Sequence, residues 1–128
     1  MNVLGLGTDI VETARLAASI ERHGAAFLDR VFLESERAYC DRGATPERCY
    51  AARFAAKEAV AKALGTGIGA QLSWRDIEIV RQPSGQPAVL LHGTGVATAA
   101  ALGIRVWLLS LSHSDHYATA TALALGGE

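Results

Sequence analysis

Hydrophobic spacing divides the chain into a small set of helices and strands. Residues 3–11 form an apolar, β-branched run interrupted by two glycines and an aspartate, which indicates a buried strand. Residues 46–64 are dense in alanine, with Pro46 suited to a first helical turn and Gly65 suited to a helix end, so they predict one long helix. Further helices are expected over residues 14–22, 26–32, 35–43 and 93–102, and further strands over 77–81, 88–91, 105–112 and 117–125.

The order of these elements indicates an α+β fold. A turn rich in Pro and Gly at 83–87 joins two short strands and predicts a hairpin, and a polar turn at 112–116 joins the last two strands. No repeat, low-complexity segment or linker divides the sequence. We therefore expect a single domain over residues 1–128, in which a mostly antiparallel sheet packs on the long central helix.

Composition excludes several classes of function. Half of the 128 residues are hydrophobic and 20% are charged, which is typical of a compact globular domain. The net charge of -1 argues against broad attraction to nucleic acid or to an anionic membrane surface. No run of about 18 uncharged apolar residues is present, and the first residues lack the pattern of a signal peptide. We expect a cytoplasmic protein that binds neither nucleic acid nor membrane.

The size of the domain limits the ligand that one chain can enclose. A domain this small has little room for a deep cleft, so a ligand as large as a nucleotide cofactor would need a second subunit to help enclose it.

The cysteines and arginines are two further features of the composition. Cys40 and Cys49 lack metal-type spacing, and we expect two reduced thiols in a cytosolic protein. Arginine is concentrated in the first half of the chain, at Arg15, Arg22, Arg30, Arg37, Arg42, Arg48 and Arg53.

Acidic and basic groups occur where the pattern predicts burial. Asp9 lies in the first predicted strand. If its carboxylate is buried there, it needs a cation or hydrogen-bond donors as partners. The alternative is that Asp9 caps the helix that follows. Phe54, Glu58 and Lys62 share one stripe of the long helix because they are four residues apart. One interpretation is an exposed Glu58–Lys62 ion pair worth about 0.2–0.5 kcal/mol. The other is that Glu58 and Asp9 hold Mg²⁺ while Lys62 meets a phosphate.

A third polar group lies near the C-terminus, where Ser110, Ser112 and His113 end a predicted strand. A serine and a histidine adjacent on a strand point to opposite sides, so they do not form a catalytic triad. The segment is either a polar turn with local hydrogen bonds to the backbone or a set of donors for a phosphate.

Together these segments resemble the bacterial holo-acyl-carrier-protein synthases, a short type of 4′-phosphopantetheinyl transferase. The most specific match is Arg-Phe-Ala-Ala-Lys-Glu-Ala-Val-Ala-Lys-Ala-Leu-Gly at 53–65, which is similar to the family's signature helix. Val-Leu-Gly-Leu-Gly-Thr-Asp-Ile-Val-Glu at 3–12 resembles the opening strand, and Ser-Leu-Ser-His-Ser at 110–114 resembles the closing segment. Order and rough spacing agree over nearly the whole chain, but 40–50 matches less clearly, so no basic contacts are carried over from it.

The resemblance implies an activity and an assembly. The expected reaction moves 4′-phosphopantetheine from coenzyme A to a serine of apo acyl carrier protein, releases 3′,5′-adenosine bisphosphate and supports fatty acid biosynthesis. Mg²⁺ is the expected cofactor, and a homotrimer with an active site at each subunit boundary is the expected assembly. Two other functions remain open: an inactive module that binds coenzyme A or the carrier protein, and a small oligomeric structural protein.

The same resemblance assigns roles to individual residues. Asp9 and Glu58 are expected to hold Mg²⁺, with Glu58 as the first choice of general base and Lys62 as a contact of the pyrophosphate. The catalytic group is therefore Asp9, Glu58 and Lys62. The coenzyme is expected to be bound by Arg53, Lys62, Gly65, Pro87, His113 and Ser114. The acidic carrier protein is expected to dock on Arg15, Arg22, Phe27, Arg30 and Phe54.

Overall fold

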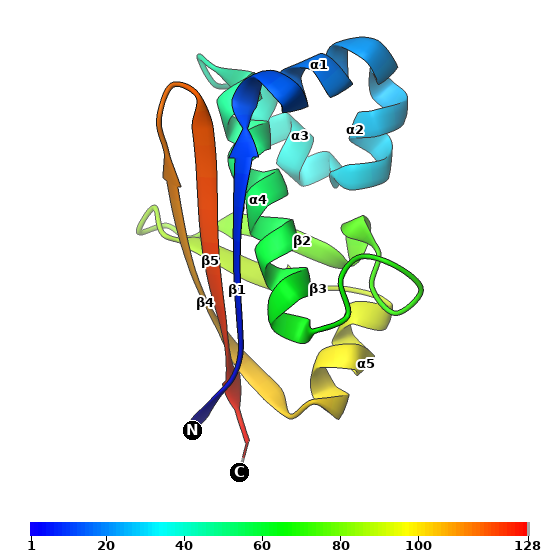
Figure 1. Cartoon of the computed structure of the whole chain (residues 1–128), viewed down its shortest axis with the longest axis vertical. Helices are drawn as coiled ribbons and strands as arrows, with labels where there is room; N and C mark the ends of the chain where they lie inside the picture. The colour runs from blue at the N-terminus through cyan, green and yellow to red at the C-terminus, as the bar shows by residue number, and fades with distance from the viewer. Residues whose placement is uncertain (128) are drawn as a thin grey trace.

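The structure, a computed structural model, describes residues 1–127 and confirms an α+β architecture around one long helix (Figure 1). The elements are β1 (Asn2–Glu12), α1 (Thr13–His23), α2 (Ala25–Val31), α3 (Glu34–Asp41), α4 (Pro46–Leu64), a 3₁₀ turn η1 (Trp74–Asp76), β2 (Ile77–Arg81), β3 (Pro87–Leu91), α5 (Thr94–Ala101), β4 (Ile104–His113) and β5 (Tyr117–Gly126). The helices α1 to α3 gather at one end of the molecule, and α5 lies near the opposite end, where both termini are found.

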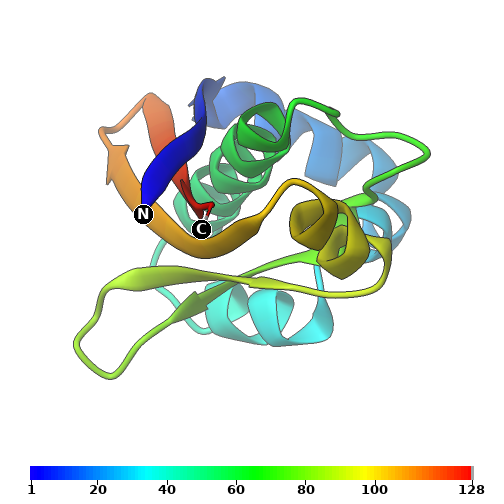
Figure 2. The same ribbon diagram turned by 90° about the horizontal axis from the view of Figure 1, so that it is seen from below.

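The strands form two antiparallel sheets. One has the order β1-β5-β4, and the other is the predicted β2-β3 hairpin. Seen along the length of the molecule, α4 lies between the three-stranded sheet and the hairpin (Figure 2). In the order β1-β5-β4, the first and last strands of the chain are neighbours, and Leu6 pairs with Leu123.

The three-stranded sheet packs very closely on α4 because the facing residues are small. A Cβ added to Gly5 would overlap the carbonyl oxygen of Ala63, and one added to Gly7 would overlap that of Ala59. The inward residues of β5 are alanines as well, and they are buried against the alanines of α4. This close approach explains why β1 carries two glycines in an otherwise β-branched run.

A buried ion pair joins α3 and the hairpin to α4. Lys57 is fully buried, and its Nζ lies 2.8 Å from Oε1 of Glu36, which is also buried. Lys57 Nζ also donates to the carbonyl oxygens of Trp74 and Ile77, at 3.1 and 2.6 Å, and Glu36 Oε2 accepts the backbone N–H of Ile79. Burial lowers the pKa of Lys57, and the charge of Glu36 opposes that shift. Lys57 therefore serves the fold, although it lies inside the signature helix beside Glu58.

The expectation of two free thiols is wrong. Cys40 in the last turn of α3 and Cys49 in the first turn of α4 form a disulfide, with their Cα atoms 5.3 Å apart. The segment between them folds back so that the two helices meet at these positions. A separation of nine residues carries no signal for such a pairing, because it depends on how the two helices pack.

Part of the outer face of the three-stranded sheet is apolar and exposed. Leu6 of β1 is 63% exposed, it shares a row of the register with Leu123 and Leu108, and Val106 of β4 is exposed as well. The next row, Thr8–Thr121–Ser110, is polar and separates this patch from Ile10, which is 64% exposed. An exposed apolar patch is typical of a protein–protein interface. No helix within residues 1–127 is long and apolar enough to cross a membrane.

Candidate active site

Asp9 and Glu58 come from distant parts of the chain and line one cavity, which we call the acidic cavity. Its volume is about 350 Å³. It is lined by Asp9, Ile10, Val11, Glu12, Arg15, Leu16, Ser19, Phe27, Phe54 and Glu58. Asp9 faces α4 because alternation along β1 places it on the same side as Gly5 and Gly7, which touch that helix.

Lys62 pairs with Asp9. Its Nζ lies 3.1 Å from Asp9 Oδ1 and donates to the carbonyl oxygen of Thr8 at 2.9 Å. The side chain of Asp9 is only 17% exposed, whereas that of Lys62 is 51% exposed. Asp9 is therefore a carboxylate with a cationic partner, which is one of the ways expected for it to be satisfied in this strand, and Lys62 pairs with Asp9 instead of forming the simple surface pair with Glu58.

The electrostatics of the acidic cavity favour a divalent cation. The pKa of Glu58 is raised, mainly by burial and then by the negative charge of Asp9, and Lys62 opposes this shift. Three carboxylates that line the cavity, those of Asp9, Glu12 and Glu58, are matched by two cations, Arg15 and Lys62, so one negative charge is left in excess. Among residues 1–127 there is no cluster of three or more His, Cys, Asp or Glu side chains that could hold a metal. Two carboxylates completed by water and phosphate oxygens are a usual donor set for Mg²⁺, so this pair fits the ion.

Aromatic rings form the other wall of the acidic cavity. Phe54 stacks on Trp74 with ring centroids 4.8 Å apart and on Phe27 at 6.4 Å. Phe27 is buried, so it contributes mainly to core packing, and a docking partner could reach only the part that lines the cavity. The three arginines of the docking prediction, Arg15, Arg22 and Arg30, are exposed on α1 and α2.

A second and larger cavity, the arginine cleft, lies on another face of α4. Its volume is about 620 Å³. The charged residues that line it are Arg42, Arg48, Arg53 and Arg81, joined by His113, and none of its described lining residues is acidic. Cys49, Gly85 and Pro87 also line it. A cleft with this charge suits an anionic ligand such as a phosphate.

Arg53 is the most buried cation of the arginine cleft. It is 4% exposed, and its guanidinium lies 4.4 Å from the centroid of the Tyr39 ring. Its Nη1 donates to Cys49 Sγ at 3.3 Å, while its Nε has no hydrogen-bond partner within residues 1–127. Arg42 and Arg81 also lie over the Tyr39 ring, at 5.9 and 5.6 Å. One tyrosine thus gathers three guanidinium groups.

The structure separates the residues expected to bind the coenzyme. Arg53 and Glu58 are five residues apart on α4, which is about 140° around the helix axis, so they face different cavities. Arg53, Pro87 and His113 line the arginine cleft, whereas Lys62 lies beside Asp9. A single chain therefore places the residues expected to bind the coenzyme in two separate locations, which we call half-sites.

Three residues expected to bind the coenzyme line neither described cavity: Lys62, which pairs with Asp9, and Gly65 and Ser114. Gly65 ends α4 with φ of 80°, a left-handed conformation that favours glycine. Ser114 Oγ accepts the backbone N–H groups of His116 and Tyr117, at 3.4 and 3.3 Å, which matches the polar-turn interpretation.

Sequence reasoning missed Tyr39 and Arg81, and it noted Arg42 and Arg48 only as members of an arginine-rich half. The available signal was only that concentration of arginine, because residues 1–64 hold equal numbers of acidic and basic side chains. What the sequence lacked was the position of the hairpin, which brings Arg81 to α3.

A family model and curated relatives both match nearly the whole length of this chain. A family model described as the 4′-phosphopantetheinyl transferase superfamily matches residues 5–122. The chain is 45% identical over 121 residues to the holo-[acyl-carrier-protein] synthase of Koribacter versatilis, covering 94% of this chain and 97% of the relative. It is 50% identical over 125 residues to that of Chlamydia felis, covering 98% and 99%.

Solved structures give the same result. The crystal structure of holo-[acyl-carrier-protein] synthase from Neisseria meningitidis superposes with a TM-score of 0.90 at 33% identity, covering 97% of this chain and 99% of that one. The Helicobacter pylori synthase in complex with coenzyme A gives a TM-score of 0.84 at 32% identity, covering 94% and 99%.

Replacing Asp9 with Asn tests the electrostatic coupling in the acidic cavity. We expect the pKa of Glu58 to fall, because one of the two causes that raise it is removed and Lys62 is released from its partner. The measurement is a ¹³C NMR titration of the glutamate side chains without divalent cation. Asp29→Asn, at an exposed aspartate of α2, is the control and should leave the Glu58 midpoint unchanged. An identical Glu58 midpoint in Asp9→Asn and the unchanged protein would contradict the shared cavity.

Proposed function

The chain belongs to the 4′-phosphopantetheinyl transferase superfamily, and we propose that it is a holo-acyl-carrier-protein synthase. It transfers the 4′-phosphopantetheine group of coenzyme A to a serine of apo acyl carrier protein, giving the holo carrier protein and 3′,5′-adenosine bisphosphate. The observation that carries this proposal is the convergence of Asp9 and Glu58 on one cavity, with Lys62 bonded to Asp9. The proposal includes a role in fatty acid biosynthesis and a location in the cytoplasm.

The reaction forms one phosphorus–oxygen bond and breaks another. The carrier serine hydroxyl attacks the β-phosphorus of coenzyme A, and the phosphoanhydride bond breaks to release the adenosine bisphosphate. Glu58 takes the serine proton directly or through a water, a role that suits a carboxylate whose pKa is raised. Lys62 stabilises the negative charge that collects on the pyrophosphate oxygens.

Asp9 and Glu58 would hold Mg²⁺, with water and pyrophosphate oxygens completing its coordination. When bound, the ion supplies further stabilisation of negative charge on the phosphoryl oxygens. Phe54 shields the cavity from solvent on the side of Trp74. The exposed Arg15, Arg22 and Arg30 offer positive charge beside this cavity to an acidic carrier protein, with the aromatic edge of Phe27 next to them.

We propose further that the active site is completed between subunits of a homotrimer. The acidic cavity of one chain would face the arginine cleft of its neighbour, so that Arg53, Pro87 and His113 bind the nucleotide phosphates of a coenzyme whose pyrophosphate lies at Lys62. Two observations support this arrangement: the half-sites face different directions in one chain, and part of the outer sheet face, around Leu6 and Leu108, is apolar and exposed. Gly65 and Ser114 stay predicted contacts of the coenzyme.

Mass spectrometry of the carrier protein tests the function. Incubation of apo carrier protein with coenzyme A, Mg²⁺ and this protein should add about 340 Da to the carrier, the mass of the phosphopantetheine group. Glu58→Gln should lower kcat/KM by about 100-fold or more, because the base is lost. Glu34→Gln, at an exposed position of α3, is the matched control. Binding of coenzyme A without any mass gain would favour the inactive binding module instead.

Mixing two inactive variants tests the shared active site. Arg53→Ala and Glu58→Gln each damage a different half-site, so each homotrimer should be weak. Random mixing through reversible unfolding should restore about a quarter of the unchanged activity, since one boundary in four then combines two intact half-sites. Mixed samples that stay as inactive as the separate variants would show that the two half-sites do not work together across a boundary.

A further inference from the structure

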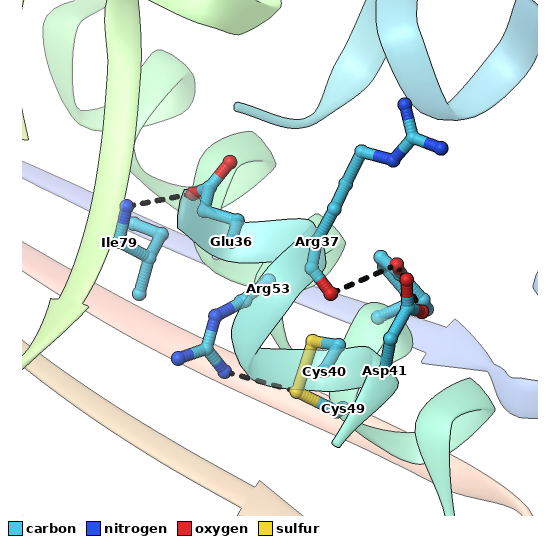
Figure 3. The surroundings of a disulfide bond; sticks show 8 residues. Glu36, Arg37, Cys40, Asp41, Cys49, Arg53 and Ile79 are labelled. Atoms are coloured by element: carbon cyan, nitrogen blue, oxygen red, sulfur yellow. Dashed lines mark hydrogen bonds between the residues drawn. A yellow bond between two sulfur atoms is a disulfide. The ribbon is translucent and has the colours of Figure 1, made fainter. Parts of the chain in front are cut away.

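The Cys40–Cys49 disulfide forms part of the wall of the arginine cleft. Cys49 is partly exposed and lines the cleft, whereas Cys40 is fully buried behind it. Figure 3 shows the two sulfurs between α3 and α4, with the Arg53 guanidinium directed at Cys49. The donated hydrogen bond from Arg53 Nη1 to Cys49 Sγ is 3.3 Å long. The disulfide thus touches the most buried cation of the cleft.

The disulfide also closes the segment that carries two other cations. Residues 41–48 run from the end of α3 to the start of α4 between the bonded cysteines, and this segment holds Arg42 and Arg48. Arg48 is further tied to Asp115 at 2.9 Å, but most of the segment is exposed. The covalent link therefore limits the positions that Arg42 can take over the cleft.

We propose that Cys40–Cys49 is a reversible thiol–disulfide exchange site whose redox state sets the affinity of the arginine cleft for the phosphates of coenzyme A. The proposal rests on the function given above and adds regulation to the same site. In the cytoplasm, the location proposed above, disulfides are usually catalytic or redox-sensing, which favours a regulatory role over a purely structural one. The reactant is a dithiol reductant, either a small molecule or the Cys pair of a reducing protein.

The exchange balances as a two-electron reduction. A thiolate of the reductant attacks Cys49 Sγ, the accessible sulfur, and forms a mixed disulfide while the Cys40 sulfur leaves and takes up a proton. The second thiol of the reductant then attacks the reductant sulfur that is bonded to Cys49, and the Cys49 sulfur is released. The protein gains the Cys40 thiol and a Cys49 thiolate, the remaining proton passes to solvent, and the dithiol leaves as a disulfide.

Reduction should weaken phosphate binding for two reasons with the same sign. In the oxidised protein the Cys49 sulfur is neutral, so the positive charge of Arg53 is available to a phosphate. In the reduced protein the Cys49 sulfur lies in a cleft lined by guanidinium groups, which stabilise it as the thiolate. That thiolate competes with the phosphate for Arg53. Loss of the link also frees the segment with Arg42 and Arg48, so ordering it around a ligand costs more conformational entropy.

The experiment compares oxidised protein with protein reduced by dithiothreitol, each verified by its mass after thiol alkylation of a sample. We expect reduction to weaken coenzyme A binding, measured by calorimetry, and to raise the KM for coenzyme A by about five- to tenfold, as for the loss of one charge-assisted contact. The KM for carrier protein should stay the same, because docking uses α1 and α2. Cys40→Ser/Cys49→Ser should show no response to the reductant.

Cys40→Ser alone keeps the Cys49 thiol without the link and should bind coenzyme A as weakly as the reduced protein. Equal affinities in the two redox states, an equal change in both KM values, a response that persists in the double variant, or unfolding on reduction by circular dichroism would each overturn the proposal. If both redox states transfer phosphopantetheine and bind coenzyme A with equal affinity, only the redox inference is wrong. If coenzyme A binding depends on the redox state but no transfer occurs, only the proposed function is wrong. If the protein neither binds coenzyme A nor transfers phosphopantetheine, both are wrong.

Discussion

The close contact between β1 and α4 is the constraint on which the candidate site depends. Gly5 and Gly7 present no side chain to the helix, and the facing carbonyl oxygens belong to Ala63 and Ala59. Because strand residues alternate, the next inward position after these glycines is Asp9. The contact brings Asp9 close to Glu58 and Lys62, which directly precede Ala59 and Ala63 on the helix. A larger residue at either glycine would hold the strand away from the helix and so separate the two carboxylates.

The helix α4 organises the rest of the molecule through its different faces. One face receives β1 and the alanines of β5, another holds Lys57 in its buried pair with Glu36, and a third carries Arg53 into the arginine cleft. A buried lysine without its partner would be strongly unfavourable, so the Lys57–Glu36 pair fixes α3 against α4. That attachment sets the place of Tyr39, which gathers the guanidinium groups of the cleft.

The sequence was sufficient for the helices and strands and for the positions of three site residues, whose roles stay predictions. The long helix has the predicted bounds because its end signals, Pro46 and Gly65, are local, and the hairpin and the last two strands follow from alternation. Asp9, Glu58 and Lys62 converge as expected. Features that depend on packing between distant segments were not accessible: the disulfide, and the burial of Lys57, whose partner Glu36 lies on another helix. Spacing on α4 already implied that Arg53 and Glu58 face apart, and the structure shows the two cavities that result.

The central claim is that the glycine contact holds the two carboxylates at a working distance, and a single added methyl group tests it most directly. Gly7→Ala should lower the free energy of unfolding by about 1–3 kcal/mol through overpacking, and at a temperature where the variant is still folded it should lower kcat for transfer by about tenfold or more. Gly69→Ala, where an added Cβ meets open space, should change stability by no more than about 0.5 kcal/mol and leave kcat unchanged. A folded Gly7→Ala protein with unchanged kcat would contradict the account.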